Sequence, residues 1–129
     1  MPTNHQEIVL EEVFSGILRL TLNDEKRRNA LSENMLDSLY TKIMAAAENS
    51  EIRVIILAAK GAVFCAGHDL KEISEARRSK DKGIGYFKKL FDKCSEVMNA
   101  IVTHPKPVIA EINCNYRLRM GHNLSLIHI

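Results

Sequence analysis

The chain has 129 residues, enough for one domain, and its 46% hydrophobic and 26% charged residues are ordinary proportions for a globular protein. Lys and Arg number 18 against 16 Asp and Glu, and the resulting net charge of +2 gives no general preference for nucleic acid. The 3 cysteines are widely spaced, which argues against a disulfide framework and against a zinc site built on paired cysteines.

The N-terminal region carries no recognisable targeting signal. Glu7, Glu11 and Glu12 all precede the first arginine, Arg19, whereas a transit peptide is rich in arginine and poor in acidic residues. No apolar run in the chain is long enough to form a membrane-spanning helix. We therefore expect either a cytosolic protein or a sequence that begins downstream of a targeting segment.

Two strands and a helix are predicted first along the chain. The strands cover residues 7–13 and 17–22, and Ser15-Gly16 between them is a typical hairpin turn. Ser32 is a suitable N-cap, and the apolar residues that follow recur at three- and four-residue spacing. This pattern predicts an amphipathic helix that ends at about Ala47.

A buried strand follows the helix. Residues 52–59 read IRVIILAA, a continuous apolar run that is typical of a strand buried on both faces. Apolar spacing over residues 84–101 predicts a second helix, which ends before Pro105, and residues 108–112 predict a further buried strand. The alternation of strands and helices indicates the α/β class, with a βαβ unit and a parallel sheet.

The turn after this strand, Phe64-Cys65-Ala66-Gly67-His68-Asp69-Leu70, is the most informative segment. A glycine at the carboxyl end of a parallel strand lets the backbone turn sharply and expose N–H groups. A helix that starts just afterwards adds partial positive charge. Such amides can stabilise an oxyanion, although an ordinary strand-to-helix turn has the same pattern.

Four segments in order resemble the crotonase, or enoyl-CoA hydratase/isomerase, superfamily. The run FCAGHDLKE is similar to the family signature, and the others are ILRLTLNDEKRRNALSENMLDSL, IRVIILAAKG and HPKPVIAEIN. Together they span roughly residues 8–113. His68 at the variable position of the signature, with the later CSEVM at residues 94–98, resembles one mitochondrial branch of the family.

The resemblance implies a site for an acyl-CoA thioester. In the family, the residue at the position of His68 donates its backbone N–H to the oxyanion hole. Arg27 and the basic residues after Lys71 are further candidates for contact with the 3′-phosphate of CoA. The implied substrate-binding residues are Arg28, Ala30, Ala66, Gly67, Asp69 and Leu70. No metal is implied, and no cofactor apart from the coenzyme A that forms part of the substrate.

The sequence departs from the family after Asn113. There the family continues with a glycine-rich turn that supplies the second oxyanion amide, and hydratases place acid/base glutamates beyond it. Here Cys114-Asn115-Tyr116 follows instead. We therefore divide the chain into a partial domain, residues 1–113, and an atypical tail, residues 114–129. The tail is expected to lie outside the fold and to derive from a frameshift, a splice variant or an assembly error.

These observations predict an incomplete fold, the N-terminal half of the crotonase ββα spiral, in a protein of acyl-CoA and fatty acid metabolism. A thioester bound there would undergo hydration, isomerisation or hydrolysis, but this chain is expected to lack efficient turnover because one oxyanion donor and the glutamates are missing. The full-length protein is expected to form a homotrimer or hexamer. The branch indicates mitochondria, and the missing presequence leaves the cytoplasm open.

Two other functions stay open. The chain is alternatively a non-enzymatic fragment that retains CoA or modulates full-length subunits. RNA binding ranks last because the sequence shows no platform of stacking aromatic residues.

Several residues have a second interpretation. The imidazole of His68 is a candidate general base, and Asp69 is a candidate helix cap. The remaining alternatives are structural: core packing for Cys65 and Cys94, a solvated helix face for Glu72 and Glu75, a surface loop for His104, and an edge or pocket position for Glu111.

Overall fold

A β-hairpin begins the fold. The structure is a computed structural model and describes residues 7–61, 63–113 and 124–128. Strand β1 (Val9–Phe14) pairs antiparallel with β2 (Ile17–Leu22). Ser15 and Gly16 both have positive φ, +49° and +80°, which is the conformation of the tight hairpin turns whose twist matches the strands. The predicted hairpin is confirmed.

A parallel sheet is built on this hairpin. The strand order is β1-β2-β3-β4-β5, in which β3 (Val54–Ala59) is parallel to both β2 and β4 (Val108–Asn113). Helix α1 (Glu33–Glu48) links β2 to β3 after a short 3₁₀ turn, Glu25–Arg27. Helices α2 (Leu70–Arg77) and α3 (Ile84–Val102) link β3 to β4. The α/β class and the βαβ arrangement are confirmed.

The backbone of the predicted tail is described only in part. Strand β5 (Leu124–His128) pairs antiparallel with β4, at the edge of the sheet. Residues 114–123 and 129 lie outside the described residues. The assignment of residues 114–129 to a tail separate from the domain stays a prediction.

Helix α1 begins and packs as its sequence predicts. The hydroxyl of Ser32 accepts a hydrogen bond from the N–H of Met35 at 3.2 Å, which caps the first turn. The buried residues recur at helical spacing on one face: Met35, Leu36, Leu39, Ile43 and Ala46. This stripe packs on the sheet, because its three- and four-residue spacing turns all five side chains the same way.

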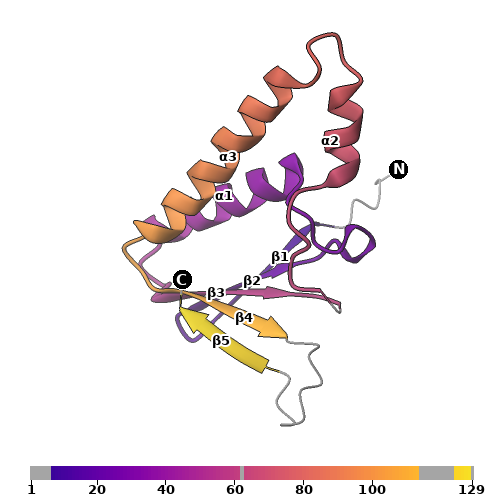
Figure 1. Ribbon diagram of the computed structural model, residues 1–129. Coiled ribbons are helices and arrows are strands. Elements are labelled where there is room, and N and C mark those ends of the chain that lie inside the picture. Colours follow the sequence, from indigo (N-terminus) through magenta and orange to yellow (C-terminus); the bar gives the residue numbers. More distant parts are fainter. Residues whose placement is uncertain (1–6, 62, 114–123, 129) are drawn as a thin grey trace, which may run out of the picture.

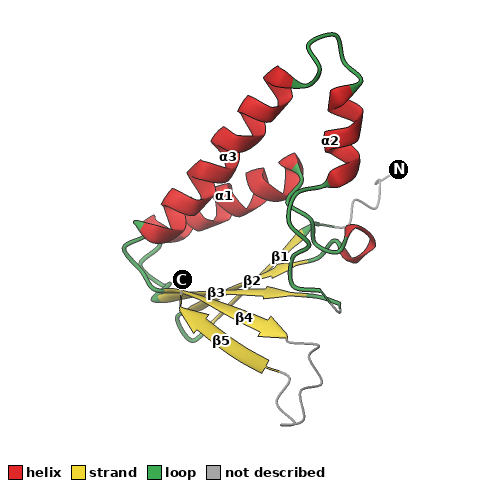
Figure 2. Cartoon of the chain, viewed as in Figure 1, coloured by secondary structure: helices red, strands yellow, loops and turns green. Residues whose placement is uncertain are grey.

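Helical cover lies on only one face of the sheet (Figures 1 and 2). In β2 the buried side chains alternate, at Leu18, Leu20 and Leu22, and the residues between them are half-buried. Strand β3 was expected to be buried on both faces, and this is wrong: Val54 and Ile56 are half-buried. The reason is that no helix among the described residues covers their side, so an apolar run was taken for two-sided burial.

An ion pair lies on the uncovered face. The guanidinium of Arg19 donates to both carboxylate oxygens of Glu111 at 2.5 and 2.9 Å. Arg19 is on β2 and Glu111 on β4, so the pair bridges across β3, where Ile56 is the register partner of Arg19. Glu111 therefore has a structural partner on the open face, away from the helices.

Helix α3 is apolar over more of its surface than it buries. Leu90, Val97, Ala100 and Ile101 are buried, and α3 packs beside α1. On its other flank Phe91 is 58% exposed and Val102 is 74% exposed. Helices α2 and α3 together form a hairpin that projects away from the sheet (Figure 1). One flank of this hairpin therefore presents apolar side chains to solvent.

The turn between α2 and α3 gives a prediction about pH. The carboxylate of Asp81 accepts hydrogen bonds from the hydroxyl of Ser79 and from the N–H groups of Gly83 and Gly85, at 2.7, 3.0 and 3.0 Å. These bonds, that of Ser79 foremost, lower the pKa of Asp81 to about 2. A lowered pKa means that the charged form stabilises the turn above pH 3.8, and that this contribution is lost as the pH falls through about 2.

We expect the amide resonances of Gly83 and Gly85 in NMR spectra to titrate with a midpoint near pH 2. An Asp81→Asn variant serves as the control and should lack this transition. A midpoint near 3.8, the ordinary value for an aspartate, would contradict the turn geometry.

Candidate functional site

Two loops meet at the carboxyl ends of β2 and β3. The 24–31 loop leads into α1, and the 63–69 loop leads into α2. The N–H of Ala66 donates to the carbonyl of Arg28 at 3.0 Å, and the N–H of Leu31 donates to the carbonyl of Gly67 at 2.7 Å. The two segments predicted to bind substrate, far apart in sequence, are thus joined by a short parallel bridge between Leu31 and His68.

Asn29 holds the two loops together, and sequence reasoning gave it no role. Its side chain is fully buried, with 1% exposure. The amide nitrogen donates to the carbonyls of Lys60 and Val63 at 2.9 and 2.8 Å, and the amide oxygen accepts from the N–H of Asp24 at 2.8 Å. Its φ is +54°, a conformation that asparagine tolerates better than most residues. An asparagine next to an alanine within a charged loop was the available signal.

Gly67 shapes the turn that carries the candidate oxyanion amide. Its φ of +87° is one that side-chain-bearing residues rarely adopt, while the space where a Cβ would stand is open, with no atom within 4 Å. The N–H of Gly67 donates to the sulfur of Cys65 at 3.4 Å. Among the described residues, no acceptor takes the N–H of His68. A donor without a protein partner therefore lies beside open space.

Asp69 caps α2, as one of its two interpretations predicted. It is buried, with 8% exposure, and its carboxylate accepts from the N–H groups of Lys71 and Glu72 at 3.0 and 3.4 Å. The guanidinium of Arg27 lies 3.4 Å from the same carboxylate. Asp69 therefore already neutralises the positive end of α2, so a bound oxyanion would depend on the His68 amide more than on the helix.

The other predicted substrate-binding residues differ in accessibility. Arg28 and Ala66 are exposed, and Leu70 is 76% exposed. Ala30 is buried at 5%; its N–H donates to Arg27 and its carbonyl accepts from the N–H of Ser32. Its side chain thus belongs to the core. Cys65 and Cys94 both pack against the hydrophobic core, which confirms the structural interpretation of these thiols.

The α2–α3 hairpin is attached to the site through Glu72. The hydroxyl of Tyr86 donates to Glu72 at 2.8 Å, and the same carboxylate oxygen lies 3.4 Å from the N–H of Glu33 at the start of α1. Burial, reinforced by this hydrogen bond, raises the pKa of Tyr86, so the phenol remains a donor. The expectation of a solvated face is wrong for Glu72, which is half-buried, and holds for Glu75, which is exposed.

His104 also contacts the fold more closely than a surface loop residue would. Its Nε2 lies 2.9 Å from the carbonyl of Ile43 in α1, and its Nδ1 accepts from the N–H of Lys106 at 3.1 Å. The prediction of a free surface position is therefore wrong. This histidine fixes the chain between α3 and β4, far along the sequence from the two loops.

A cavity of about 430 Å³ opens beside the two loops. Its lining includes two cations and one carboxylate: Glu25, Arg28, Asn29, Lys60, Gly61 and Val63. Cations next to an unpartnered amide are a setting in which phosphate and carbonyl oxygens can both be held. Residues 7–61, 63–113 and 124–128 contain no group of three His, Cys, Asp or Glu side chains placed to hold a metal ion.

The described helices include none that is long and apolar enough to cross a bilayer.

Comparison with known proteins gives consistent relatives. The family model described as enoyl-CoA hydratase/isomerase matches residues 17–116, a range that contains both loops. The chain is 45% identical over 98 residues to mouse enoyl-CoA hydratase domain-containing protein 3, mitochondrial, which covers 76% of this chain and 31% of the relative. The zebrafish protein of the same name is 42% identical over 113 residues, which are 37% of its length.

Solved structures show the same fold. The crystal structure of human enoyl-CoA hydratase domain-containing protein 3 superposes with a TM-score of 0.74 at 40% identity, over 82% of this chain and 40% of that one. An enoyl-CoA hydratase from Mycobacterium smegmatis gives 0.72 at 43% identity, over 81% and 39%. The chain therefore spans well under half the length of the relatives it matches, and its fold is the corresponding part of theirs.

Proposed function

Since the chain belongs to the enoyl-CoA hydratase/isomerase family, we propose that it binds acyl-CoA thioesters and that the backbone N–H of His68 donates to the thioester oxygen. The observation that carries this proposal is the unpartnered N–H of His68 among the described residues, next to the open space at Gly67. A thioester oxygen gains negative charge when the neighbouring carbon loses a proton or accepts a nucleophile. A fixed amide donor stabilises that charge.

The CoA moiety would extend along the 24–31 loop. Arg28 is exposed there, and the side chain of Arg27 is 52% exposed beyond its contact with Asp69. Guanidinium groups suit phosphates because they donate in a planar fork. Arg28, Ala66, Gly67 and Leu70 thus act through accessible atoms. Ala30 and Asp69 act by supporting the loops from within.

Turnover by this chain is proposed to be slow. Removing one oxyanion donor costs about 10²- to 10³-fold in rate, and general acid/base groups contribute about 10²- to 10⁴-fold. The sequence after Asn113 has neither the glycine-rich turn nor glutamates in family context. The family reaction, whether hydration, isomerisation or hydrolysis, would then need groups from outside residues 1–113. We also propose a mitochondrial location, because the most similar curated relatives bear that designation.

Calorimetric titration with crotonyl-CoA tests the binding proposal. We expect saturable binding that is tighter than for free CoA, with no loss of the enoyl absorbance on the time scale of turnover. Arg28→Asn should weaken binding about two- to fivefold, as expected for one exposed ionic contact of up to about 1 kcal/mol. Asparagine is chosen because it tolerates the φ of +54° at this position.

The matched control is Arg53→Asn, an exposed arginine just before β3, which should leave the affinity unchanged. Equal weakening by both variants would reduce the effect to net charge. Absence of crotonyl-CoA binding would contradict the proposed function, and rapid hydration would contradict the predicted lack of turnover.

A second candidate function is assembly with full-length subunits. It is favoured by the apolar flank of α3, where Ile84 is 71% and Val102 is 74% exposed, because monomeric proteins rarely leave such surface uncovered. Co-expression with a full-length family member followed by size-exclusion chromatography tests it. A shared peak would support assembly, and separate peaks would exclude it.

A further inference from the structure

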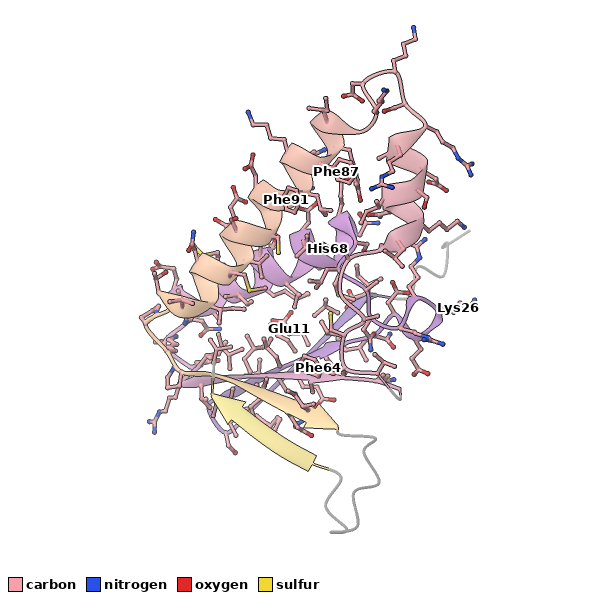
Figure 3. The ribbon with its side chains drawn as sticks, viewed as in Figure 1. Glu11, Lys26, Phe64, His68, Phe87 and Phe91 are labelled. Atoms are coloured by element: carbon pink, nitrogen blue, oxygen red, sulfur yellow. The ribbon has the colours of Figure 1, made fainter. Side chains whose placement is uncertain are left out.

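The imidazole of His68 has no function in the site as described above. It packs edge-on against the ring of Phe91, with ring centroids 6.3 Å apart and an interplanar angle of 88°. Figure 3 places it at the side of α3 that carries Phe87 and Phe91. The amide and the imidazole of one residue thus lie on the same approach, so a ligand held by the first is close to the second.

One ring nitrogen of His68 is buried without a partner. Nδ1 has less than 1 Å² of accessible surface, and no hydrogen-bonding group among the described residues reaches it. It is the single buried side-chain nitrogen or oxygen in the described part of the chain with this property. Buried polar atoms in native proteins almost always have partners, and an exception points to a bond made in another state, such as a complex with a ligand.

The surroundings of this nitrogen can admit a ligand. Phe91, which packs against the imidazole, is 58% exposed, so the apolar side of the ring contact is open to solvent. The position next to Gly67 is also empty. Rotation of the imidazole about its Cβ–Cγ bond exchanges Nδ1 with Cδ2, a broad torsion with little preference. The nitrogen can therefore turn from the buried side to the open side without any change in the backbone.

We infer that the imidazole of His68 selects thioesters whose acyl chain carries a hydroxyl group near the thioester carbonyl. This rests on the proposed function, in which the amide of His68 holds the carbonyl oxygen. A hydroxyl both donates and accepts, so it satisfies the free nitrogen in either tautomer of the ring. A plain hydrocarbon chain leaves that nitrogen unpartnered, and a site built around a polar partner discriminates against a ligand that lacks it.

The test compares 3-hydroxybutyryl-CoA with butyryl-CoA, which differ by one hydroxyl, in calorimetric titrations of the full chain. We expect the hydroxylated ester to bind about tenfold more tightly, which corresponds to one satisfied hydrogen bond. The quantity compared between variants is the ratio of the two affinities, because a general loss of binding cancels in it.

Three variants assign the effect to a single nitrogen. Asparagine places a polar atom where Nδ1 stands, so His68→Asn should retain a preference. Glutamine places its polar atoms at the distance of Nε2, and leucine has none, so His68→Gln and His68→Leu should bring the ratio to about one, as the loss of a single hydrogen bond predicts. A preference that survives in His68→Leu overturns the inference.

Equal affinity of the parent chain for the two esters overturns the inference while leaving the proposed function intact. Absence of binding by both esters overturns the proposed function and this inference with it.

Discussion

Replacing Asn29 with alanine is expected to lower the free energy of unfolding by about 3–5 kcal/mol. Three buried hydrogen bonds disappear, each worth about 1 kcal/mol, and alanine must then hold a positive φ, which costs about 1–2 kcal/mol more. The bonds concerned join Asn29 to Asp24, Lys60 and Val63. Since the total stability of a small domain is about 5–15 kcal/mol, we expect a large decrease in the urea midpoint measured by circular dichroism.

Two further variants separate the causes. Asn29→Gly keeps access to the positive φ and removes only the hydrogen bonds, so it should be less destabilising than alanine. Asn34→Ala replaces an exposed asparagine in the first turn of α1 and should change stability by no more than about 0.5 kcal/mol. An Asn29→Ala chain as stable as the Asn34→Ala chain would show that the loops are held together by other contacts.

The second large effect is expected from adjacent isoleucines on opposite faces of β3. Ile55 is fully buried beneath the helices, whereas Ile56 is half-buried on the uncovered face. Ile55→Ala should cost about 2–5 kcal/mol, because it removes buried methyl groups and leaves a cavity. Ile56→Ala removes the same atoms from a partly solvated surface and should cost about 1 kcal/mol.

The comparison uses the same measurement, the urea midpoint, and needs no other control because both the residue type and the strand are matched. Similar losses in the two variants would mean that the Ile56 side of the sheet is covered in solution. Size-exclusion chromatography at two protein concentrations would then identify association as the source of that cover.

The elements of this fold follow from the sequence because their signals are local. Ser15-Gly16 specifies a tight turn, and Ser32 specifies the start of α1, through bonds within a few residues. Pattern alone could not distinguish one-sided from two-sided burial of β3, since that depends on which elements cover each face. The run of residues 52–59 is equally apolar in both cases.

The site was predictable in position but not in its internal support. Gly67 and His68 stand out because a glycine after a buried strand marks a turn. Asn29 does not, because its partners are carbonyl oxygens 31 and 34 residues away, and a carbonyl carries no sequence signature. The contact of Tyr86 with Glu72 joins two helices and is hidden for the same reason.

The bridge between the two loops lies entirely within the first 70 residues, and this has a consequence for biosynthesis. Strands β1 to β3, helix α1 and the contacts of Asn29 are complete before α3 is translated, and N-terminal units generally fold first as a chain leaves the ribosome. The amide of His68 would then acquire its setting early. Its imidazole would meet Phe91 only after the second crossover has emerged, so the two groups of one residue mature at different times during synthesis.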